Sequence, residues 1–246
     1  AMSLEFMDNF SNYGTDESFM GDGVYAQRAG TLQNDPDGVS GGKVFELNSG
    51  TGTDTLRRVL SSAQTTVGVA FRLWMPTLPG ASNQQPDVLA FSDTANSVQV
   101  YLLVETTGIL AIYRGSTVLG RSSVPVITAG AWNHIEMKVF FSQTVGTVEV
   151  RVNGVPQITL TGQDTCNTAN VECSQIRFNS SGVMSTYYIK DLYIWNGGGS
   201  VHNDFVGDVQ VVTLRPASDV NLNWTPSTGA TGYNLIDEST PDDTDY

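Results

Sequence analysis

His134, Glu136 and Lys138 alternate with apolar residues in the stretch AWNHIEMKVFF. The stretch GTVEVRVNG begins at residue 146 and repeats the alternation with Glu149 and Arg151. A histidine near a carboxylate is a pair that general acid–base catalysis uses. The same alternation is typical of a strand that has one face in water. The charged row is therefore either a catalytic site or an outer wall.

Antiparallel pairing of these two stretches satisfies both faces in a single register. The pairs are Ile135–Val152, Met137–Val150 and Val139–Val148 on the apolar face, and Glu136–Arg151, Lys138–Glu149 and His134–Asn153 on the charged face. A shift of one residue would send the apolar set into water. The sequence thus predicts a solvated wall with an apolar core behind it, in preference to a catalytic pair of His134 and Glu136.

Alternating stretches of this kind continue along most of the chain. The predicted strands are 43–47, 66–74, 87–91, 97–105, 108–114, 117–121, 133–141, 146–153, 156–160, 174–178 and 187–195, with 208–214 as a further candidate. Many short strands separated by turn residues indicate an all-β sandwich or barrel. The segment DTLRRVLSSAQ has its apolar residues at helical spacing, but we interpret it as a short strand.

The charge of the chain lies mainly at its two ends. The formal net charge is −13, with nine acidic and two basic residues in 1–54, and eight acidic and one basic residue in 204–246. A nucleic-acid surface needs a basic patch, so nucleic acid is not an expected partner. No stretch is long and apolar enough for a membrane-spanning helix, so no membrane partner is expected.

The two cysteines, Cys166 and Cys173, lie in the polar segment DTCNTANVECSQ. No histidine lies near them in the sequence, which argues against a zinc site. A local disulfide between them and a pair of free thiols are both compatible with the spacing.

The runs GAWNHIEMKVFF, GTVEVRVNGV and YYIKDLYIWNG together resemble laminin G-like and concanavalin A-like domains over roughly residues 6–196. The resemblance implies a jelly-roll sandwich of two antiparallel sheets. We expect residues 1–207 to form this jelly roll. Residues 208–246 are expected to be a C-terminal extension, or the start of a truncated second β unit, because too few residues remain for a complete domain.

Resemblance to this fold also raises the question of enzymatic activity. β-Glucanases of the fold carry three carboxylates on one strand, whereas the late strand YYIKDLYIW has only Asp191. With no catalytic residues identified, the expectation from sequence is a protein that is not an enzyme.

A structural Ca²⁺ ion is a further implication of the resemblance. Concanavalin A-like domains often hold one calcium between the N-terminal segment and the late strand, which points to Asp191 with Glu46 and Asp22. A hard cation bound by oxygen ligands would relieve repulsion between the two acidic ends. The alternative is that Asp191 caps a turn or faces solvent.

Sugar binding requires aromatic platforms beside polar groups. Strand alternation places Arg72 and Trp74 on the outward side of one strand, and Gln99 and Tyr101 on the outward side of another. We expect these four to line one ligand-binding face, the alternative being that Trp74 and Tyr101 pack under a loop.

The tail, which begins NDFVGDVQVVTLRPASD, resembles phage and prophage virion proteins. The function expected from sequence is therefore a phage-type virion structural or adhesion protein of the capsid exterior or tail, made in the host cytoplasm. Its partners would be other virion proteins, copies of itself and a glycan. The alternative is a carbohydrate-binding module of a secreted bacterial protein.

Overall fold

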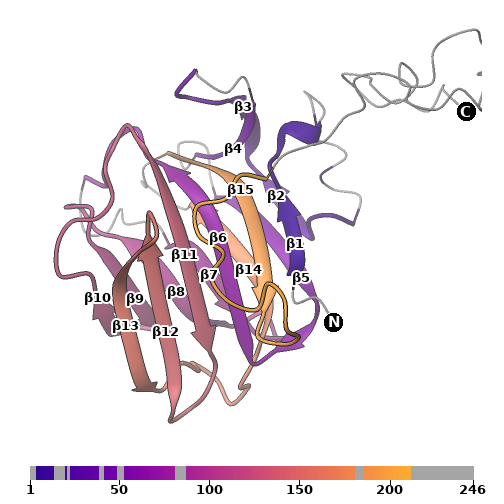
Figure 1. Ribbon diagram of the computed structural model, residues 1–246, viewed down its shortest axis with the longest axis vertical. Coiled ribbons are helices and arrows are strands. Elements are labelled where there is room, and N and C mark those ends of the chain that lie inside the picture. Colours follow the sequence, from indigo (N-terminus) through magenta and orange to yellow (C-terminus); the bar gives the residue numbers. More distant parts are fainter. Residues whose placement is uncertain are drawn as a thin grey trace, which may run out of the picture.

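Two antiparallel sheets pack face to face in the computed structural model, which describes residues 4–13, 20, 23–38, 42–48, 53–80, 87–180 and 186–211 (Figure 1). In order, the front sheet consists of β13 (Val155–Gln163), β12 (Gly146–Val152), β11 (Trp132–Phe140), β6 (Thr66–Trp74), β15 (Tyr187–Asn196), β4 (Lys43–Leu47) and β3 (Thr31–Asn34), and β1 (Leu4–Asp8) also pairs with β15. The rear sheet consists of β10 (Thr117–Arg121), β9 (Leu110–Arg114), β8 (Val98–Val104), β7 (Asp87–Ser92), β14 (Cys173–Ser180), β5 (Asp54–Gln64) and β2 (Gln27–Ala29). The predicted all-β jelly-roll sandwich is confirmed.

The predicted register of β11 with β12 is also confirmed. Ile135 pairs with Val152 and Met137 with Val150, and each of these four side chains is at most 4% exposed. Burying one such side chain stabilises the fold by about 1.5–3 kcal/mol, so the inward row fixes the register.

The core lies between the sheets, where their inward rows meet. Phe71 of the front sheet packs edge-to-face on Phe178 of the rear sheet, with ring centroids 5.0 Å apart. Both rings are almost fully buried. Such contacts add about 0.5–1.5 kcal/mol to the burial itself, so they help to hold one sheet on the other.

The segment with helical spacing is an eleven-residue strand, β5. It pairs with β14 along its length and with β2 near its start, and these pairings outweigh a periodicity that alone would suit a helix. Leu56 and Leu60 face the core, while Val59 is 45% exposed. The prediction of a strand is therefore confirmed, although the strand is long.

Three strands were missed, and the further candidate at 208–214 is wrong where it can be checked. β1, β2 and β3 are too short, at five, three and four residues, for their alternation to stand out. Residues 208–211 form no strand, and 212–214 lie outside the described residues. The boundary at residue 207 stays a prediction. Within the described ranges, no helix has the length and apolarity needed to cross a membrane.

After β15 the chain turns back across the front sheet. We call residues 197–211 the strap. Figure 1 shows it as an orange loop in front of β15 and β6. Its contacts, described below, make part of the sheet's outer face an interior surface.

A bulge interrupts β15 at Asp191. Lys190 pairs with Arg72 and Tyr193 with Ala70, so β15 uses one residue more than β6 over this step. Asp191 has a φ of 51°, in the left-handed region that a non-glycine residue seldom adopts. The extra residue shifts the alternation, so Tyr188 and Lys190 face outward before the bulge and Tyr193 and Trp195 face outward after it.

The two cysteines are free thiols, so the disulfide alternative is not what the structure contains. Cys166 lies in the loop before β14, and Cys173 is its first residue. Burial raises the pKa of Cys173 to about 12 and also raises the pKa of Cys166. Both thiols are therefore protonated at neutral pH.

Candidate functional site

Three aromatic side chains form a row across the outer face of the front sheet. Tyr188 pairs with Trp74, and Trp74 pairs with Trp132 on its other side. The Trp74 and Trp132 ring centroids are 5.6 Å apart. All three side chains are partly exposed. We call Tyr188, Trp74 and Trp132 the aromatic row. Its partly exposed rings give an apolar surface on which a flat apolar group could pack.

The Trp132 ring is held in place by two charged side chains. Its Nε1 donates a hydrogen bond of 3.1 Å to Asp35 Oδ1. Lys190 Nζ lies 2.5 Å from Asp35 Oδ2 and 4.2 Å from the centroid of the Trp132 ring. The Asp35 side chain is only 1% exposed. These contacts fix the ring orientation before any ligand arrives, which lowers the entropy cost of binding.

Arg72 connects the aromatic row to the strap. Its Nε lies 3.3 Å from Asp191 Oδ2, and its Nη2 donates to Asp208 Oδ1 of the strap at 2.7 Å. Asp191 also accepts a hydrogen bond of 3.1 Å from the backbone N–H of Val211. Burial raises the pKa of Asp191, while the Val211 N–H and Arg72 act against that rise.

Glu136, on β11 beneath the strap, binds the backbone of the strap. Its Oε1 accepts hydrogen bonds from the backbone N–H groups of Val206 and Gly207, at 3.2 and 3.0 Å, and from the Tyr193 hydroxyl at 3.1 Å. Tyr193 OH also lies 3.1 Å from the Gly207 carbonyl oxygen. Glu136 is fully buried. Its carboxylate is therefore an anchor for the strap.

The predicted solvated wall is wrong for Glu136 and His134, which are 0% and 2% exposed. Both point outward from the sheet as the register requires, but the strap covers them. Neither ring nitrogen of His134 has a hydrogen-bond partner among the described residues, and the same holds for Glu136 Oε2. Burial lowers the pKa of His134, partly opposed by the charges of Glu136 and Asp208.

The strap also makes two contacts with charged side chains on β11 and β12. Asp204 Oδ1 lies 3.1 Å from Lys138 Nζ. Phe205 lies under Arg151, whose guanidinium carbon is 3.9 Å from the ring centroid. Phe205 packs edge-on against Trp195 as well, with centroids 5.9 Å apart. An ion pair, a cation–π contact and a contact between two aromatic rings therefore hold the strap on the sheet.

Trp195 lies flat on the sheet because its neighbour has no side chain. A Cβ atom on Gly68 would fall 2.0 Å from Trp195 Cε2. The indole is 1% exposed and stacks on Tyr193 at 5.5 Å. A glycine here permits the close approach of ring and backbone.

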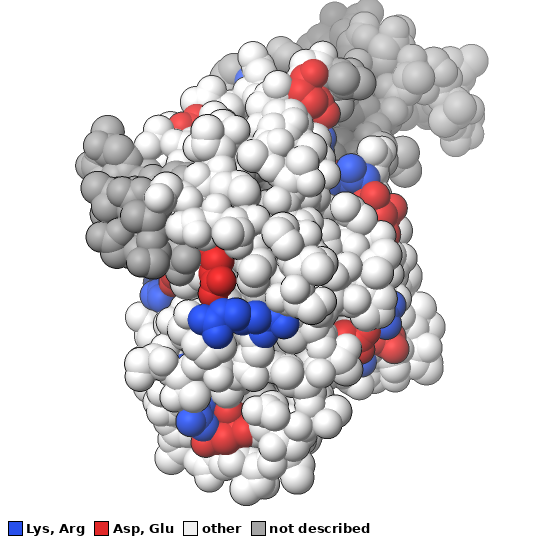
Figure 2. Space-filling model, turned by 90° about the vertical axis from the view of Figure 1, so that its left-hand side faces the viewer, with Lys and Arg blue, Asp and Glu red and all other residues white. Residues whose placement is uncertain are grey.

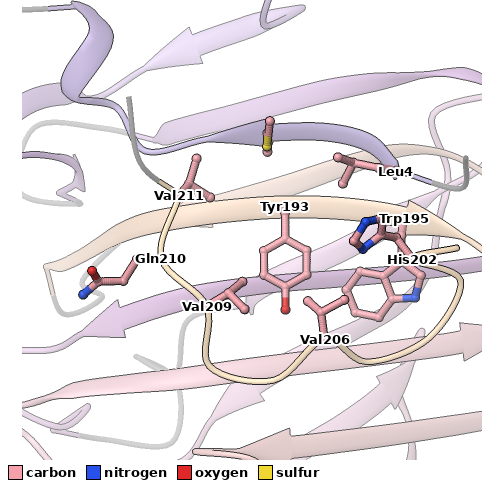
Figure 3. A pocket seen from close by; sticks show the side chains of 9 residues that line it. Leu4, Tyr193, Trp195, His202, Val206, Val209, Gln210 and Val211 are labelled. Carbon is pink, nitrogen blue, oxygen red and sulfur yellow. The ribbon is translucent and has the colours of Figure 1, made fainter. Parts of the chain in front are cut away.

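An apolar cavity of about 210 Å³ separates the strap from β1 (Figure 3). Leu4, Tyr193, Trp195 and Val209 are among the side chains that line it. Met7 of β1, also in the lining, is 59% exposed. The strap therefore packs closely on β11 and β6 but loosely on the β1 side.

The four predicted ligand residues do not form one site. Arg72 and Trp74 lie on the front sheet, whereas Gln99 and Tyr101 lie on β8 of the rear sheet. Outward-facing residues of opposite sheets point away from each other, which is why alternation alone grouped them wrongly. Arg72 and Trp74 keep the predicted outward position.

On the rear sheet, the loop before β14 covers Gln99. Gln99 is fully buried, accepts a hydrogen bond from Asn167 N at 2.6 Å and donates to Asp93 Oδ2 at 2.8 Å. Tyr101 stacks on Tyr113 at 5.3 Å. Gln99 has a structural part in holding the loop, and no described contact ties it to the aromatic row.

The calcium site stays a prediction. Asp22 lies outside the described residues, Glu46 accepts a hydrogen bond from Asn48 Nδ2 at 3.1 Å, and Asp191 contacts Arg72. In the part of the chain that the structure describes, no three His, Cys, Asp or Glu side chains gather as a metal site would need. A thermal melt with and without a chelator tests the ion, and an unchanged midpoint would contradict it.

Side chains of opposite charge lie beside one another on the flank seen in Figure 2, and uncharged residues cover most of it. Arg114 and Asp164 form one ion pair of the described residues, and Arg121 with Glu105 another, at 2.7 Å. No broad basic surface appears on this flank. Whether nucleic acid is a partner stays a prediction.

Sequence reasoning missed Trp132, Tyr188 and Lys190. Trp132 is the second residue of AWNHIE and Tyr188 the second residue of YYIKD, so their residue types were visible. Their proximity was not, because it depends on β6 lying between β11 and β15. Strands that are distant in sequence meet here, as they do in many jelly rolls.

No family model matches the chain, and no curated protein matches it in sequence. Solved structures do match its fold. Alginate lyase Aly36B has a TM-score of 0.53 at 14% identity, covering 80% of this chain and 98% of the lyase. The binding domain of Paraclostridial Mosquitocidal Protein 1 has a TM-score of 0.54 at 15% identity, covering 79% and 49%. A sialidase has a TM-score of 0.55 at 13% identity, covering 79% of this chain.

This chain spans about a fifth of that sialidase's length, since the match covers 19% of it. At these identities the likeness establishes the jelly-roll fold. It also corrects the expectation that the protein is not an enzyme. That expectation depended on the missing carboxylates of one enzyme family, but the fold is shared with an enzyme of another kind, the alginate lyase Aly36B. The missing triad therefore does not exclude catalysis.

Proposed function

We propose that the protein binds a carbohydrate at the aromatic row, as an adhesion or carbohydrate-binding module. The observation that carries the proposal is the row itself: Tyr188, Trp74 and Trp132 are neighbours in register and partly exposed on one face. Sugar rings have apolar faces that pack on aromatic rings, and hydroxyl groups that need polar partners.

Polar partners flank the row on both sides. Glu46 pairs with Tyr188 at one end of the row, and Lys190 and Arg72 lie one step below it. These groups can donate to and accept from hydroxyls, which gives a ligand its orientation. Rings that supply contact area beside a few polar groups that supply specificity are typical of a ligand site.

The comparisons support the class of ligand. One solved form of alginate lyase Aly36B, a double mutant in complex with an alginate trisaccharide, matches this fold with a TM-score of 0.54 at 13% identity. The mosquitocidal-protein match is a binding domain. We extend to this chain only the general task of binding an extended ligand on a jelly roll.

The biological setting is part of the proposal. The resemblance of the tail to virion proteins favours an adhesion module on the exterior or tail of a phage-type particle, alongside other virion proteins and further copies of itself. A module of a secreted bacterial protein is the alternative. Attachment to particles, seen in a fractionated lysate, would favour the first setting.

Binding to a glycan array tests the site. We expect Trp74→Ala and Trp132→Ala each to weaken binding by about tenfold or more, because buried aromatic contacts dominate such interfaces. The matched control is Tyr113→Ala, which removes a partly exposed ring from the rear sheet and should change binding less than about twofold. Equal effects of the front and rear variants would overturn the proposal.

A further inference from the structure

The strap contacts the outer face of the front sheet, next to the aromatic row, with the kinds of groups that a bound ligand would use. It places two carboxylates on two cations, Asp204 on Lys138 and Asp208 on Arg72, at 3.1 and 2.7 Å. It inserts one ring, Phe205, between Arg151 and Trp195. It also donates two hydrogen bonds to Glu136. Each of these contacts is one that an external molecule could make instead.

We propose that residues 203–211 are an autoinhibitory cover on a binding site for glycans that contain uronic acids, a proposal that rests on carbohydrate binding at the adjacent aromatic row. A single uronate residue combines a carboxylate, hydroxyl groups and an apolar ring face, which the strap supplies from several residues. Its carboxylate suits Lys138 and Arg72, its hydroxyls can donate to Glu136, and its ring face suits Trp195.

A second observation points to an external ligand. His134 is only 2% exposed, and its side chain faces the strap. Neither of its ring nitrogens has a hydrogen-bond partner among the described residues. Glu136 Oε2 is likewise unpartnered there. Buried polar groups are nearly always hydrogen-bonded, because an unmet donor or acceptor costs free energy. The hydroxyls of a sugar would meet these groups, whereas the strap does not.

The ion pairs of the strap can be exchanged for those of a ligand at modest cost. Asp204 and Asp208 are 67% and 46% exposed in their side chains, and exposed ion pairs contribute little. On the β1 side a cavity lies between the strap and the sheet (Figure 3). Displacement would join Tyr193 and Trp195 to the aromatic row above them, giving one longer face.

The test uses the full chain with hexagalacturonate and its methyl ester, which has the same rings without charge. In the variant Asp204→Asn/Asp208→Asn, we expect about tenfold tighter binding of the acid than in the wild type, because the competing strap is weakened. The ester should gain by a similar factor, because any ligand of the uncovered face benefits when the strap is weakened, but it should bind about tenfold more weakly than the acid in both proteins. Adding Lys138→Met should reduce the advantage of the acid over the ester. All variants should keep the wild-type melting midpoint to within a few degrees, since these side chains lie at the surface.

Hydrogen exchange of the strap gives a second readout. The amides of Val206 and Gly207 donate to Glu136 in the covered state, so they should lose protection when the acid binds. Unchanged or increased protection would overturn the proposal. So would a gain for the acid alone, since the loss of two negative charges explains such a gain without displacement of the strap. So would a gain only for a peptide of residues 203–211.

Failure of this proposal can be told apart from failure of the proposed function. If Trp74→Ala abolishes glycan binding but the strap variant shows no gain for the acid, the autoinhibitory cover is excluded and the aromatic row remains. If no glycan binds to wild type or variants, both proposals are excluded.

Discussion

The open and the covered halves of the front sheet's outer face carry similar side chains in different surroundings. The open half has Trp74 and Trp132 beside Lys190, and the covered half has Trp195 and Tyr193 beside Glu136. In the open half, the tryptophan rings are partly exposed to water. In the covered half, the aromatic rings and the carboxylate are almost fully buried. The difference comes from the strap and not from the strands, which run through both halves.

Replacing one tryptophan in each half should show the largest contrast. We expect Trp195→Ala to lower the free energy of unfolding by about 3–5 kcal/mol, because it empties a fully buried site. Trp74→Ala should cost about 1 kcal/mol, since its ring is partly exposed. Urea unfolding followed by circular dichroism measures both. Equal losses would mean that the strap does not seal the covered half.

Removing one carboxylate in each half should give a smaller contrast. Glu136→Ala leaves the N–H groups of Val206 and Gly207 without their acceptor, and we expect a loss of about 1–3 kcal/mol. Glu46→Ala, on the open half, should change stability by about 0.5 kcal/mol or less. Urea unfolding of the two variants checks this, and a costlier Glu46→Ala would reverse the comparison.

The pH dependence of stability should belong to the covered half. Burial holds the pKa of His134 below its ordinary value of 6.5, so the unfolded chain takes up this proton first as the pH falls. The contribution of neutral His134 is thus complete above pH 6.5 and is lost as the pH falls from there toward the lower pKa of the folded state. In His134→Gln, unfolding midpoints between pH 7 and 5 should fall less steeply. An unchanged slope in this variant would contradict the assignment of the pH dependence to His134.

The smallest effect should come from the ion pair at the edge of the strap. Lys138→Ala removes the contact with Asp204, whose side chain is 67% exposed, so we expect a loss below about 1 kcal/mol. The loss should shrink further in 0.5 M salt, because salt screens exposed charges. Thermal melts at two salt concentrations measure it, and a larger or salt-independent loss would mean that Lys138 has a role beyond this pair.

Much of the fold follows from the sequence because burial on one face is a local signal. The valines of β12 pair with Ile135 and Met137 as their alternation requires. The order of strands is not local, and this is why Gln99 and Tyr101 were grouped with Trp74 although they lie on the other sheet. Alternation says which residues share a face of one strand, but not which strands share a sheet.

Covering segments are harder still to predict. Glu136 and His134 have the pattern of a solvated face, and nothing in their own strand signals the strap that buries them. The strap itself is irregular, with acidic residues and glycines that would suit any surface loop. Its docking depends on single contacts, such as Asp208 with Arg72, that have no periodicity to detect.

The bulge at Asp191 lets one strand follow two alternations in succession. Before it, the even-numbered residues Tyr188 and Lys190 point outward, and after it the odd-numbered Tyr193 and Trp195 do. Deleting that single amino acid would turn the hydrophobic partners Leu192 and Ile194 toward the strap and drive two large rings into the core. Homologous proteins could therefore vary in length at either end of this strand, but a deletion at Asp191 would require new side chains on both faces of the strand that follows it.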